Sequence, residues 1–377
     1  MSGGVDSSVA ALLLKRAGFQ VEGAHMKLSG GNPEAIKAAK NVAKRLGIKF
    51  HVVDLSKKFK KEIIDYFLDS YKRGLTPNPC VKCNQKIKFG ELLKAAGKLD
   101  GDFLATGHYV QSSILNYQLP INKSGAAFIE SPKAVKLSKA RFKEKDQSYF
   151  LYTLTQKQLS KVLFPLSGMA NKDEVRKIAD QAGLPYIKSE SQDVCFLFRE
   201  GKAIQHNDFL RKHLKLKPGP IILIDRGKDG KSNGRGVSNG PGAKSKPGKV
   251  IGEHQGLSLY TIGQRREIRI GGTGPYYAAK FDVKKNILYV VKDFDDPILY
   301  KDELAAKAVN WVSGKTPKMP LKCEAVIRYR HAPVKCTVTK SGNSYRVKFK
   351  NPQRAITPGQ SIVFYKGEEV LGGGIIK

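Results

Sequence analysis

The chain opens with a glycine-rich turn that runs directly into an apolar helix. The turn has the sequence Ser-Gly-Gly-Val-Asp-Ser-Ser at positions 2–8, and a run of apolar residues follows at 9–14. The glycines let successive backbone N–H groups crowd around one point, which the positive N-terminal end of the helix also faces. The segment therefore predicts a phosphate-binding site made of Ser2, Gly3, Gly4, Val5, Asp6, Ser7 and Ser8.

This turn resembles the pyrophosphatase-type loop of enzymes that split ATP into AMP and pyrophosphate. It differs from the G-x-x-x-x-G-K-[ST] loop of other nucleotide hydrolases, since no Gly-Lys-Ser/Thr follows it. Asp6 could help to hold a Mg²⁺ ion against the phosphates. ATP and Mg²⁺ are thus the expected cofactors, and the competing interpretation is a glycine-rich turn that only caps a helix.

The net charge of the chain indicates which class of molecule it binds. Its 377 residues include 67 Lys and Arg against 33 Asp and Glu, which gives a net charge of +34. Such an excess favours a polyanionic partner such as nucleic acid, the alternative being a lysine-biased genome. No apolar run is long enough to span a bilayer and no signal peptide is apparent, so we expect a cytoplasmic protein without a membrane partner.

Helices and strands alternate in the first part of the chain. Apolar periodicity predicts strands at 21–26, 50–53 and 103–106 and helices at 35–46 and 59–70. This alternation is typical of an α/β domain with a doubly wound parallel sheet, which binds ligands at the carboxyl ends of its strands. The first domain is therefore predicted to be an ATP-pyrophosphatase domain.

The pattern changes twice in the rest of the chain. Residues 149–183 are predicted to be helical with a break at 164–166, and short β runs after about residue 275 predict a C-terminal β-barrel. We expect the ATP-pyrophosphatase domain at 1–204, a small central domain at 205–275 and the barrel at 276–377. A flexible insertion is expected at 227–249. It is interpreted as a solvated loop, with RNA contact as the alternative for its residues Lys228, Lys231, Arg235, Lys244 and Lys246.

Three of the five cysteines stand beside polar residues. Cys80 and Cys83 follow the turn Thr-Pro-Asn-Pro and precede a helix predicted at 85–96, and Cys195 stands far downstream. A thiol near a helix N-terminus among lysines is expected to have a lowered pKa. By itself the C-x-x-C pair could be half a zinc site, a redox pair or two buried small residues. A reactive pair joining Cys83 and Cys195 would explain the thiols in both places.

Eight motifs occur in order along the chain, and together they are specific. They are SGGVDSS at 2–8, TPNPCVKCN at 76–84, TGHY at 106–109, KDQSYFL at 145–151, SQDVCF at 191–196, YTIGQRR at 260–266, RYRH at 328–331 and PQRAITPGQ at 352–360. The whole chain resembles the bacterial tRNA-specific 2-thiouridylases. Members of that family replace the C2 oxygen of the wobble uridine, position 34 of tRNA, by sulfur.

The resemblance implies an ATP-dependent sulfurtransferase. In that family ATP adenylates the C2 oxygen of the uridine, so that a poor leaving oxygen becomes a good one and a soft sulfur nucleophile can replace it. The sulfur arrives as a persulfide on the cysteine that matches Cys195, delivered by a cysteine desulfurase or a sulfur-relay protein. The cysteine that matches Cys83 is the catalytic nucleophile and can form a disulfide with the first.

The same correspondence implies the residues that bind each substrate. Met26 and Gly107 would join residues 2–8 around ATP. The wobble base must leave the anticodon stack to reach a thiol, so the enzyme should hold it extruded while it contacts the anticodon stem-loop. Taken singly, each of these residues has an ordinary structural explanation. The residues that match tRNA contacts are Asn78, Pro79, Cys80, His108, Lys145, Asp146, Gln147, Arg328, Tyr329 and Gln360.

The sequence departs from the family pattern in three places. The segment between Met26 and Ala35 is shorter than in many relatives, so the wall of the ATP site is expected to differ there. Relatives carry a hydrophobic strand before the glycine-rich turn, so we expect the true start to lie upstream of Met1. Many relatives carry an aspartate where this chain has Cys80, and three thiols could then act together. As an alternative cofactor, an iron–sulfur cluster could be ligated by Cys80, Cys83 and Cys195.

No other metal site is expected. A four-cysteine zinc site made of Cys80, Cys83, Cys323 and Cys336 is the alternative, but Cys323 and Cys336 do not form a second C-x-x-C. They are therefore interpreted as buried strand cysteines.

Two other functions compete with the thiolation hypothesis. A small-substrate ligase of the argininosuccinate synthetase type would use a similar ATP loop, but it needs neither distant paired thiols nor the excess positive charge. A non-catalytic RNA-binding module with a decayed ATP site would not need an intact loop and both thiols. The sequence therefore favours a tRNA-modifying enzyme, without indicating which tRNAs it modifies.

Overall fold

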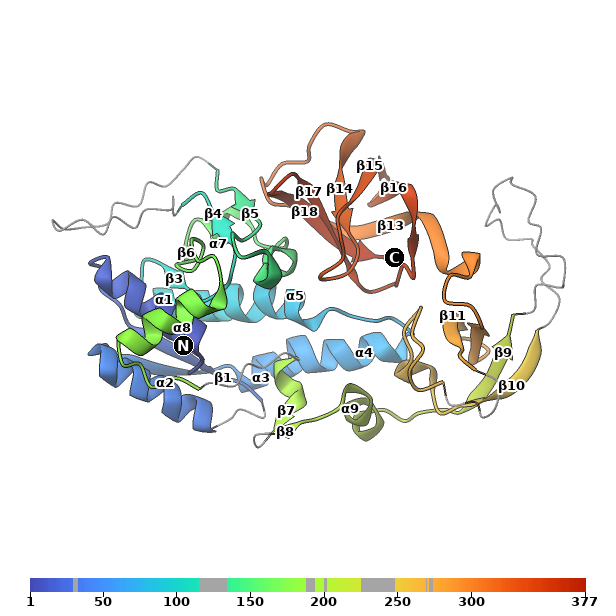
Figure 1. The fold of residues 1–377 in the computed structure, drawn as a ribbon, viewed down its shortest axis with the longest axis horizontal. Coiled ribbons are helices and arrows are strands. Elements are labelled where there is room, and N and C mark those ends of the chain that lie inside the picture. The colour runs from blue at the N-terminus through green and yellow to red at the C-terminus, as the bar shows by residue number, and fades with distance from the viewer. Residues whose placement is uncertain are drawn as a thin grey trace.

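Three domains follow one another along the chain (Figure 1). The computed structural model describes residues 1–29, 33–114, 134–187, 194–199, 202–224, 248–268, 270 and 274–377. The N-terminal helices lie at one end of the molecule and the central sheet at the other, and the C-terminal barrel lies above the long helix between them. The expected insertion falls outside the described residues except for its last two positions, as do the first three residues of the SQDVCF motif.

The N-terminal domain begins with a helix–strand alternation that confirms the prediction. Its elements are α1 (Val5–Arg16), β1 (Gly23–Lys27), α2 (Pro33–Leu46) and β2 (Phe50–Asp54). β1 and β2 are parallel neighbours. Helix α2 is amphipathic, and its apolar positions recur at helical spacing on the face that it buries. The buried residues on that face are Ala39, Val42, Ala43 and Leu46.

Two long helices follow, and each is continuous through a wider π-helical stretch. The first consists of α3 (Ser56–Phe59), η1 (Lys60–Asp65) and α4 (Tyr66–Lys72). The second consists of α5 (Pro79–Cys83), η2 (Asn84–Leu92) and α6 (Leu93–Gly97).

The predicted start of the second helix at residue 85 is wrong. The Asn78 side chain accepts a hydrogen bond from the Val81 N–H at 3.4 Å, and Pro79 occupies the first turn. Both are strong helix-start signals. Cys80 and Cys83 therefore lie inside the first turns of this helix and not ahead of it.

A second pair of parallel strands lies in the same domain. β3 (Leu104–Ala105) pairs with β6 (Val162–Leu163). The prediction of helix before the break at 164–166 is wrong at Val162–Leu163, because these residues form β6 and pair with β3. A short apolar run does not by itself distinguish strand from helix. The helices present are η4 (Ser148–Phe150), α7 (Gln156–Leu159) and α8 (Lys172–Gln181). The α/β class is confirmed, and the described parallel strands of this N-terminal domain form two separate pairs.

The central domain is built on a four-stranded sheet. Its strands are β9 (Gly219–Leu223), β10 (Lys249–His254), β11 (Tyr277–Asp282) and β12 (Ile287–Val291), in the order β10-β9-β12-β11, and helix α9 (His206–His213) precedes them. The sequence assigned β11 and β12 to a barrel beginning at residue 276. Their hydrogen bonds place them here instead, because β12 pairs in parallel with β9.

The C-terminal domain is a closed barrel of six strands. They are β13 (Tyr300–Trp311), β14 (Leu321–Val326), β15 (Val334–Ser341), β16 (Ser344–Arg354), β17 (Ser361–Lys366) and β18 (Glu369–Ile376). Pairing of β13 with both β16 and β18 closes the barrel. Cys323 and Cys336 are opposite neighbours on β14 and β15 with their sulfurs 3.7 Å apart, so both are strand cysteines as predicted.

The barrel is docked on the N-terminal domain by buried tyrosines of the KDQSYFL segment and the residue after it. The Tyr149 hydroxyl donates to the Ser361 carbonyl at 2.9 Å, and the Tyr152 hydroxyl lies 3.1 Å from the Ser361 hydroxyl. Strands β4 (Gln111–Ser112) and β5 (Leu137–Ser138) also extend the barrel sheet at β18. Because these polar groups are buried and paired, the two domains are held in one arrangement.

The remaining elements of the described chain are short. They are η3 (Lys143–Lys145), η5 (Cys195–Leu197), β7 (Phe198–Arg199), β8 (Lys202–Ala203), η6 (Leu257–Leu259) and η7 (Pro297–Leu299). No helix in the described part of the chain is long and apolar enough to cross a membrane.

Candidate active site

The glycine-rich turn packs so closely on its surroundings that two glycines are required. Gly3 has a φ of +84°, and a Cβ there would lie 2.9 Å from the Ala35 carbonyl oxygen. A Cβ on Gly107, just after β3, would lie 2.8 Å from the Asp6 carbonyl carbon. Gly4 caps α1 without a side-chain hydrogen bond, so the first N–H groups of the helix stay available to an anion. This cradle fits a phosphate group.

The side chains of the turn divide between the cradle and the core. Ser2 and Ser7 face each other with their hydroxyl oxygens 3.1 Å apart. Val5 and Ser8 are buried, so they could reach a nucleotide only through their backbone. Met26 lies half-buried on β1, at the carboxyl end where the prediction requires it.

Lys172 is a site residue that the sequence did not reveal. Its ammonium lies 2.7 Å and 2.8 Å from the two carboxylate oxygens of Asp6. The Tyr109 hydroxyl donates to the same carboxylate at 2.5 Å. Lys172 is 8% exposed although it opens helix α8, where its sequence context resembles that of any solvated lysine. Asp6 is thus ion-paired, and a Mg²⁺ ion at Asp6 would compete with this ammonium.

Replacing Lys172 by Met should weaken ATP binding roughly 10- to 100-fold, because a charge-assisted hydrogen bond contributes about 1.5–3 kcal/mol. The ammonium sits at the cradle, where it would face the nucleotide phosphates. Calorimetric titration with ATP tests this, and Lys177→Met, an exposed lysine of the same helix, should bind like the wild type. Unchanged ATP affinity in Lys172→Met would show that the lysine has only a structural role.

The thiols of Cys80, Cys83 and Cys195 lie in one neighbourhood. Cys83 is buried on α5, whereas the Cys195 side chain is exposed on η5. After burial, the strongest influences that raise the pKa of Cys195 are the charges of Cys83 and Cys80. Phe196 anchors η5, since its ring lies 5.1 Å from that of Phe67 in the long helix. The structure thus brings together thiols that are far apart in sequence.

The predicted lowering of the thiol pKa values is wrong. Burial raises the pKa of Cys83 to about 11, and the positive charge of Lys88 offsets only part of this rise. The pKa of Cys195 is raised to about 12. The Cys195 side chain is exposed, yet desolvation by the surrounding protein is the largest cause of this rise. Desolvation therefore outweighs the helix N-terminus and the neighbouring lysine.

Alkylation of Cys195 should follow this raised pKa. Only the thiolate reacts, so its rate with iodoacetamide should rise about tenfold for each pH unit between pH 7 and 10. Mass spectrometry of the Cys195 peptide measures the rate. A plateau reached below pH 9 would show that the pKa is not raised.

His108 connects the nucleotide cradle with the thiols. It follows Gly107 directly, and its Nε2 atom lies 3.5 Å from the Lys88 ammonium. Burial and Lys88 hold the pKa of His108 well below its usual range, so the ring is neutral at physiological pH. Thr106 fixes the ring through a contact of 2.7 Å to Nδ1.

The predicted tRNA contacts of the N-terminal domain and the barrel meet at one junction. Asn78 lies beside the Tyr149 side chain, and the Tyr149 ring lies 5.9 Å from that of Tyr329. The Gln360 amide donates to the Thr76 carbonyl at 3.0 Å. Asn78, with Pro79 and Cys80 after it, therefore lies beside Tyr329 and Gln360.

The residues of the KDQSYFL motif that were predicted to contact tRNA form hydrogen bonds within the protein. Asp146 accepts a hydrogen bond from the Ser148 hydroxyl at 2.7 Å, and Gln147 accepts one from the Tyr109 N–H at 3.0 Å. Lys145 precedes them on η3 and is half-buried. These hydrogen bonds orient the segment 145–148. An RNA contact by Asp146 or Gln147 would therefore use side-chain atoms or lone pairs that these bonds leave free.

The described residues hold no group of three or more His, Cys, Asp or Glu side chains placed to bind a metal ion. The iron–sulfur alternative on Cys80, Cys83 and Cys195 stays a prediction.

The three domains match three families in the same order. Residues 1–199 match the family described as the tRNA methyl transferase HUP domain. Residues 207–292 match the tRNA methyl transferase PRC-barrel domain, and residues 301–376 match the aminomethyltransferase beta-barrel domain. Fold and site thus define a three-domain protein whose α/β domain has a glycine-rich turn at the N-terminus of α1 and three cysteines that influence one another electrostatically.

The family of the chain follows from comparison along its full length. It is 38% identical to the tRNA-specific 2-thiouridylase MnmA of Vibrio cholerae over 100% of this chain and 95% of the relative. The enzyme of the same name from Coxiella burnetii is 38% identical over 100% of this chain and 96% of the relative. This chain belongs to the tRNA-specific 2-thiouridylase family. A solved tRNA methyltransferase subunit from Methanocaldococcus jannaschii aligns with a TM-score of only 0.28, at 17% identity over 48% of this chain and 72% of that one, too low to support a shared fold.

Proposed function

We propose that this protein catalyses the ATP-dependent 2-thiolation of the wobble uridine, position 34, of tRNA. The printed names of the relatives supply the substrate class. The observation that carries the proposal is the convergence of the turn and the thiols around His108. Gly107, just before it, packs against the glycine-rich turn. Lys88 contacts the His108 ring, and its positive charge also lowers the pKa of the Cys195 thiol. A phosphate cradle beside two sulfurs is what activation of an oxygen followed by sulfur attack requires.

The nucleotide end of the site would activate the uridine. Residues 2–8 and the N-terminus of α1 would hold the phosphates of ATP, and Lys172 would face them once it leaves Asp6. Mg²⁺ held with Asp6 would neutralise phosphate charge. The uridine C2 oxygen attacks the α-phosphate, pyrophosphate leaves, and the base then carries AMP as its leaving group.

The thiol end would deliver the sulfur. Cys195 is exposed, so a cysteine desulfurase or a sulfur-relay protein could load it with a persulfide. The terminal sulfur attacks C2 and AMP leaves. The buried Cys83 thiolate then attacks the Cys195 sulfur, which forms a Cys83–Cys195 disulfide and leaves the transferred sulfur on the base.

A reconstituted reaction tests this proposal. Purified protein, ATP, unmodified tRNA and a cysteine desulfurase with cysteine should produce thiolated tRNA, which migrates slowly in a gel that contains organomercury. Omission of ATP should abolish the shift. ATP-dependent joining of a small substrate without tRNA thiolation would favour the ligase, and tRNA binding without any reaction would favour a binding module. Loss of activity on removal of tightly bound iron would favour the cluster.

A further inference from the structure

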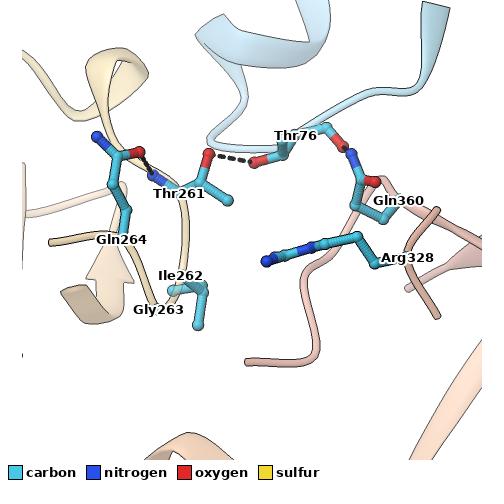
Figure 2. Close-up of a pocket in the computed structure, with 7 residues that line it drawn as sticks. All are labelled: Thr76, Thr261, Ile262, Gly263, Gln264, Arg328 and Gln360. Carbon is cyan, nitrogen blue, oxygen red and sulfur yellow. Dashed lines mark hydrogen bonds between the residues drawn. The ribbon is translucent and has the colours of Figure 1, made fainter. Parts of the chain in front are cut away.

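The thiol helix, α5 with Cys83, is preceded by a segment that both other domains hold. Thr76 lies between α4 and α5, and its N–H donates to the Pro358 carbonyl of the barrel at 3.0 Å. The Thr76 carbonyl accepts a hydrogen bond from the Gln360 amide at 3.0 Å, and the Thr76 hydroxyl oxygen lies 3.3 Å from that of Thr261 in the central domain. Figure 2 shows Thr76 between these two partners, in the wall of a cavity of about 340 Å³ where the three domains meet.

The barrel turn, residues 357–360, packs backbone against backbone on this segment. Gly359 has a φ of +94°, and a Cβ there would lie 2.9 Å from the Thr76 carbonyl oxygen and 3.0 Å from the Thr76 nitrogen. The turn is also bonded to the last strand of the barrel, because the Gly359 N–H donates to the Ile376 carbonyl at 2.9 Å. Any side chain at position 359 would therefore displace Thr76 or the turn itself.

A second tie holds the thiol helix just beyond Cys83. Asn84 is 3% exposed, and its side-chain amide donates to the Phe150 carbonyl at 3.1 Å. The Asn84 Oδ1 atom is buried without a hydrogen-bond partner among the described residues, so this donation fixes the amide. Tyr149, which precedes Phe150, donates to the carbonyl of Ser361, next to the barrel turn. Both ties therefore lead to the same segment of the barrel, one on each side of Cys83.

Cys195 is held by other parts of the molecule. Phe196, the residue after it, packs on Phe67 of α4 with the ring centroids 5.1 Å apart. The end of α4 is bonded to the central domain, since the Ser258 hydroxyl donates to the Tyr71 carbonyl at 3.1 Å. The two thiols are thus held through different contacts, one through the barrel and the other through the first long helix.

A disulfide forms only when its sulfurs can come within about 2.05 Å and its Cα atoms lie about 4.4–6.8 Å apart, so a small displacement of one helix changes its stability strongly. We infer that the barrel turn positions the Cys83 thiol for Cys195, and that Gly359 and Asn84 are positioning residues for sulfur transfer. The inference rests on the proposed function for the reaction that the two thiols perform. The barrel then acts on the thiols in addition to its expected tRNA contacts.

The first test is the equilibrium between the two thiols and their disulfide in Gly359→Ala. The protein is equilibrated with glutathione, where one oxidised molecule takes two electrons and two protons from the thiols and becomes two reduced molecules. Mass spectrometry of an acid-quenched, unreduced digest gives the fraction of Cys83 that is linked to Cys195. The equilibrium constant for the disulfide should fall about tenfold, which makes its reduction potential about 30 mV less negative.

The matched control is Gly342→Ala. Gly342 also lies in the barrel at a positive φ, +56°, but a Cβ there would meet nothing within 4 Å, so the constant should not change. Cys323 and Cys336, whose sulfurs lie 3.7 Å apart in the barrel, provide an internal control in the same digest. The equilibrium constant of this second pair should be the same in the wild type and in Gly359→Ala.

Asn84→Leu tests the second tie and retains a readout if Gly359→Ala folds poorly. Leu fills a similar volume without adding charge but cannot donate to Phe150, so the constant for the Cys83–Cys195 disulfide should again fall about tenfold. An unchanged constant in either variant would overturn the inference. An equal fall for both cysteine pairs would show a loosened barrel and would also overturn it.

The measurement uses neither ATP nor tRNA, so its outcome is separate from that of the proposed function. A shifted constant in a protein that never thiolates tRNA would refute the proposed function and keep the positioning role. Thiolation at the wild-type rate by Gly359→Ala, with an unchanged constant, would do the reverse.

Discussion

Cys195→Ser is expected to lower tRNA thiolation by at least about 10³-fold, because a hydroxyl can neither carry a persulfide nor exchange with one. Its ATP consumption in the presence of tRNA should persist, since the nucleotide cradle is built from other segments. Single-turnover assays that count both thiolated tRNA and released pyrophosphate separate these two steps. The protein should therefore release pyrophosphate without product.

Cys83→Ser should lose thiolation to the same extent but at a later stage. The variant should still accept a persulfide on Cys195, which mass spectrometry of the loaded protein detects. Cys323→Ser is the matched control, because it removes a half-buried thiol of the barrel and should leave the thiolation rate unchanged. Full activity in either Cys83→Ser or Cys195→Ser would contradict the two-thiol mechanism.

Gly107→Ala is expected to weaken ATP binding by about 100-fold or more. The added methyl would lie 2.8 Å from the Asp6 carbonyl carbon and 2.9 Å from the Ser7 nitrogen. Both are backbone atoms, so the nucleotide turn must move, and a misplaced cradle loses several hydrogen bonds to the phosphates at once. Titration calorimetry with ATP measures the loss.

The control for this substitution lies in the same domain. A Cβ on Gly97, in helix α6, would meet nothing within 4 Å. Gly97→Ala should leave ATP affinity unchanged and raise stability by up to about 1 kcal/mol, since Ala favours helix more than Gly does. If Gly107→Ala binds ATP as well as Gly97→Ala does, the cradle is not where the nucleotide binds.

The sequence predicted the elements whose local signals agree with their surroundings. The first strands and helix α2 show a clear apolar periodicity. The glycine-rich turn is followed directly by an apolar run, which indicates a turn at a helix N-terminus. The sequence-based prediction failed where tertiary contacts determine the secondary structure or the sheet to which a strand belongs. Strand β6 is too short to distinguish from a buried helix, and β11 and β12 carry nothing that tells the central sheet from the barrel.

The candidate site was also predicted only in part. Residues within motifs were identified, but Lys172 looks like a surface lysine until folding places it on Asp6. The sign of the thiol pKa shift was wrong, because a nearby lysine is visible in the sequence whereas burial is not. The loop 261–264 belongs to a recognised motif, yet its position against Arg328 appears only when three domains meet.

The convergence of Cys83 and Cys195 can be tested by oxidation of the folded protein. A Cys80→Ser variant treated briefly with diamide, then digested without reduction, should yield a peptide pair linked between Cys83 and Cys195 as the main product. Recovery of both as unlinked thiols, with only Cys323 and Cys336 joined, would mean that the two sulfurs do not meet and that the sulfur-transfer account is wrong.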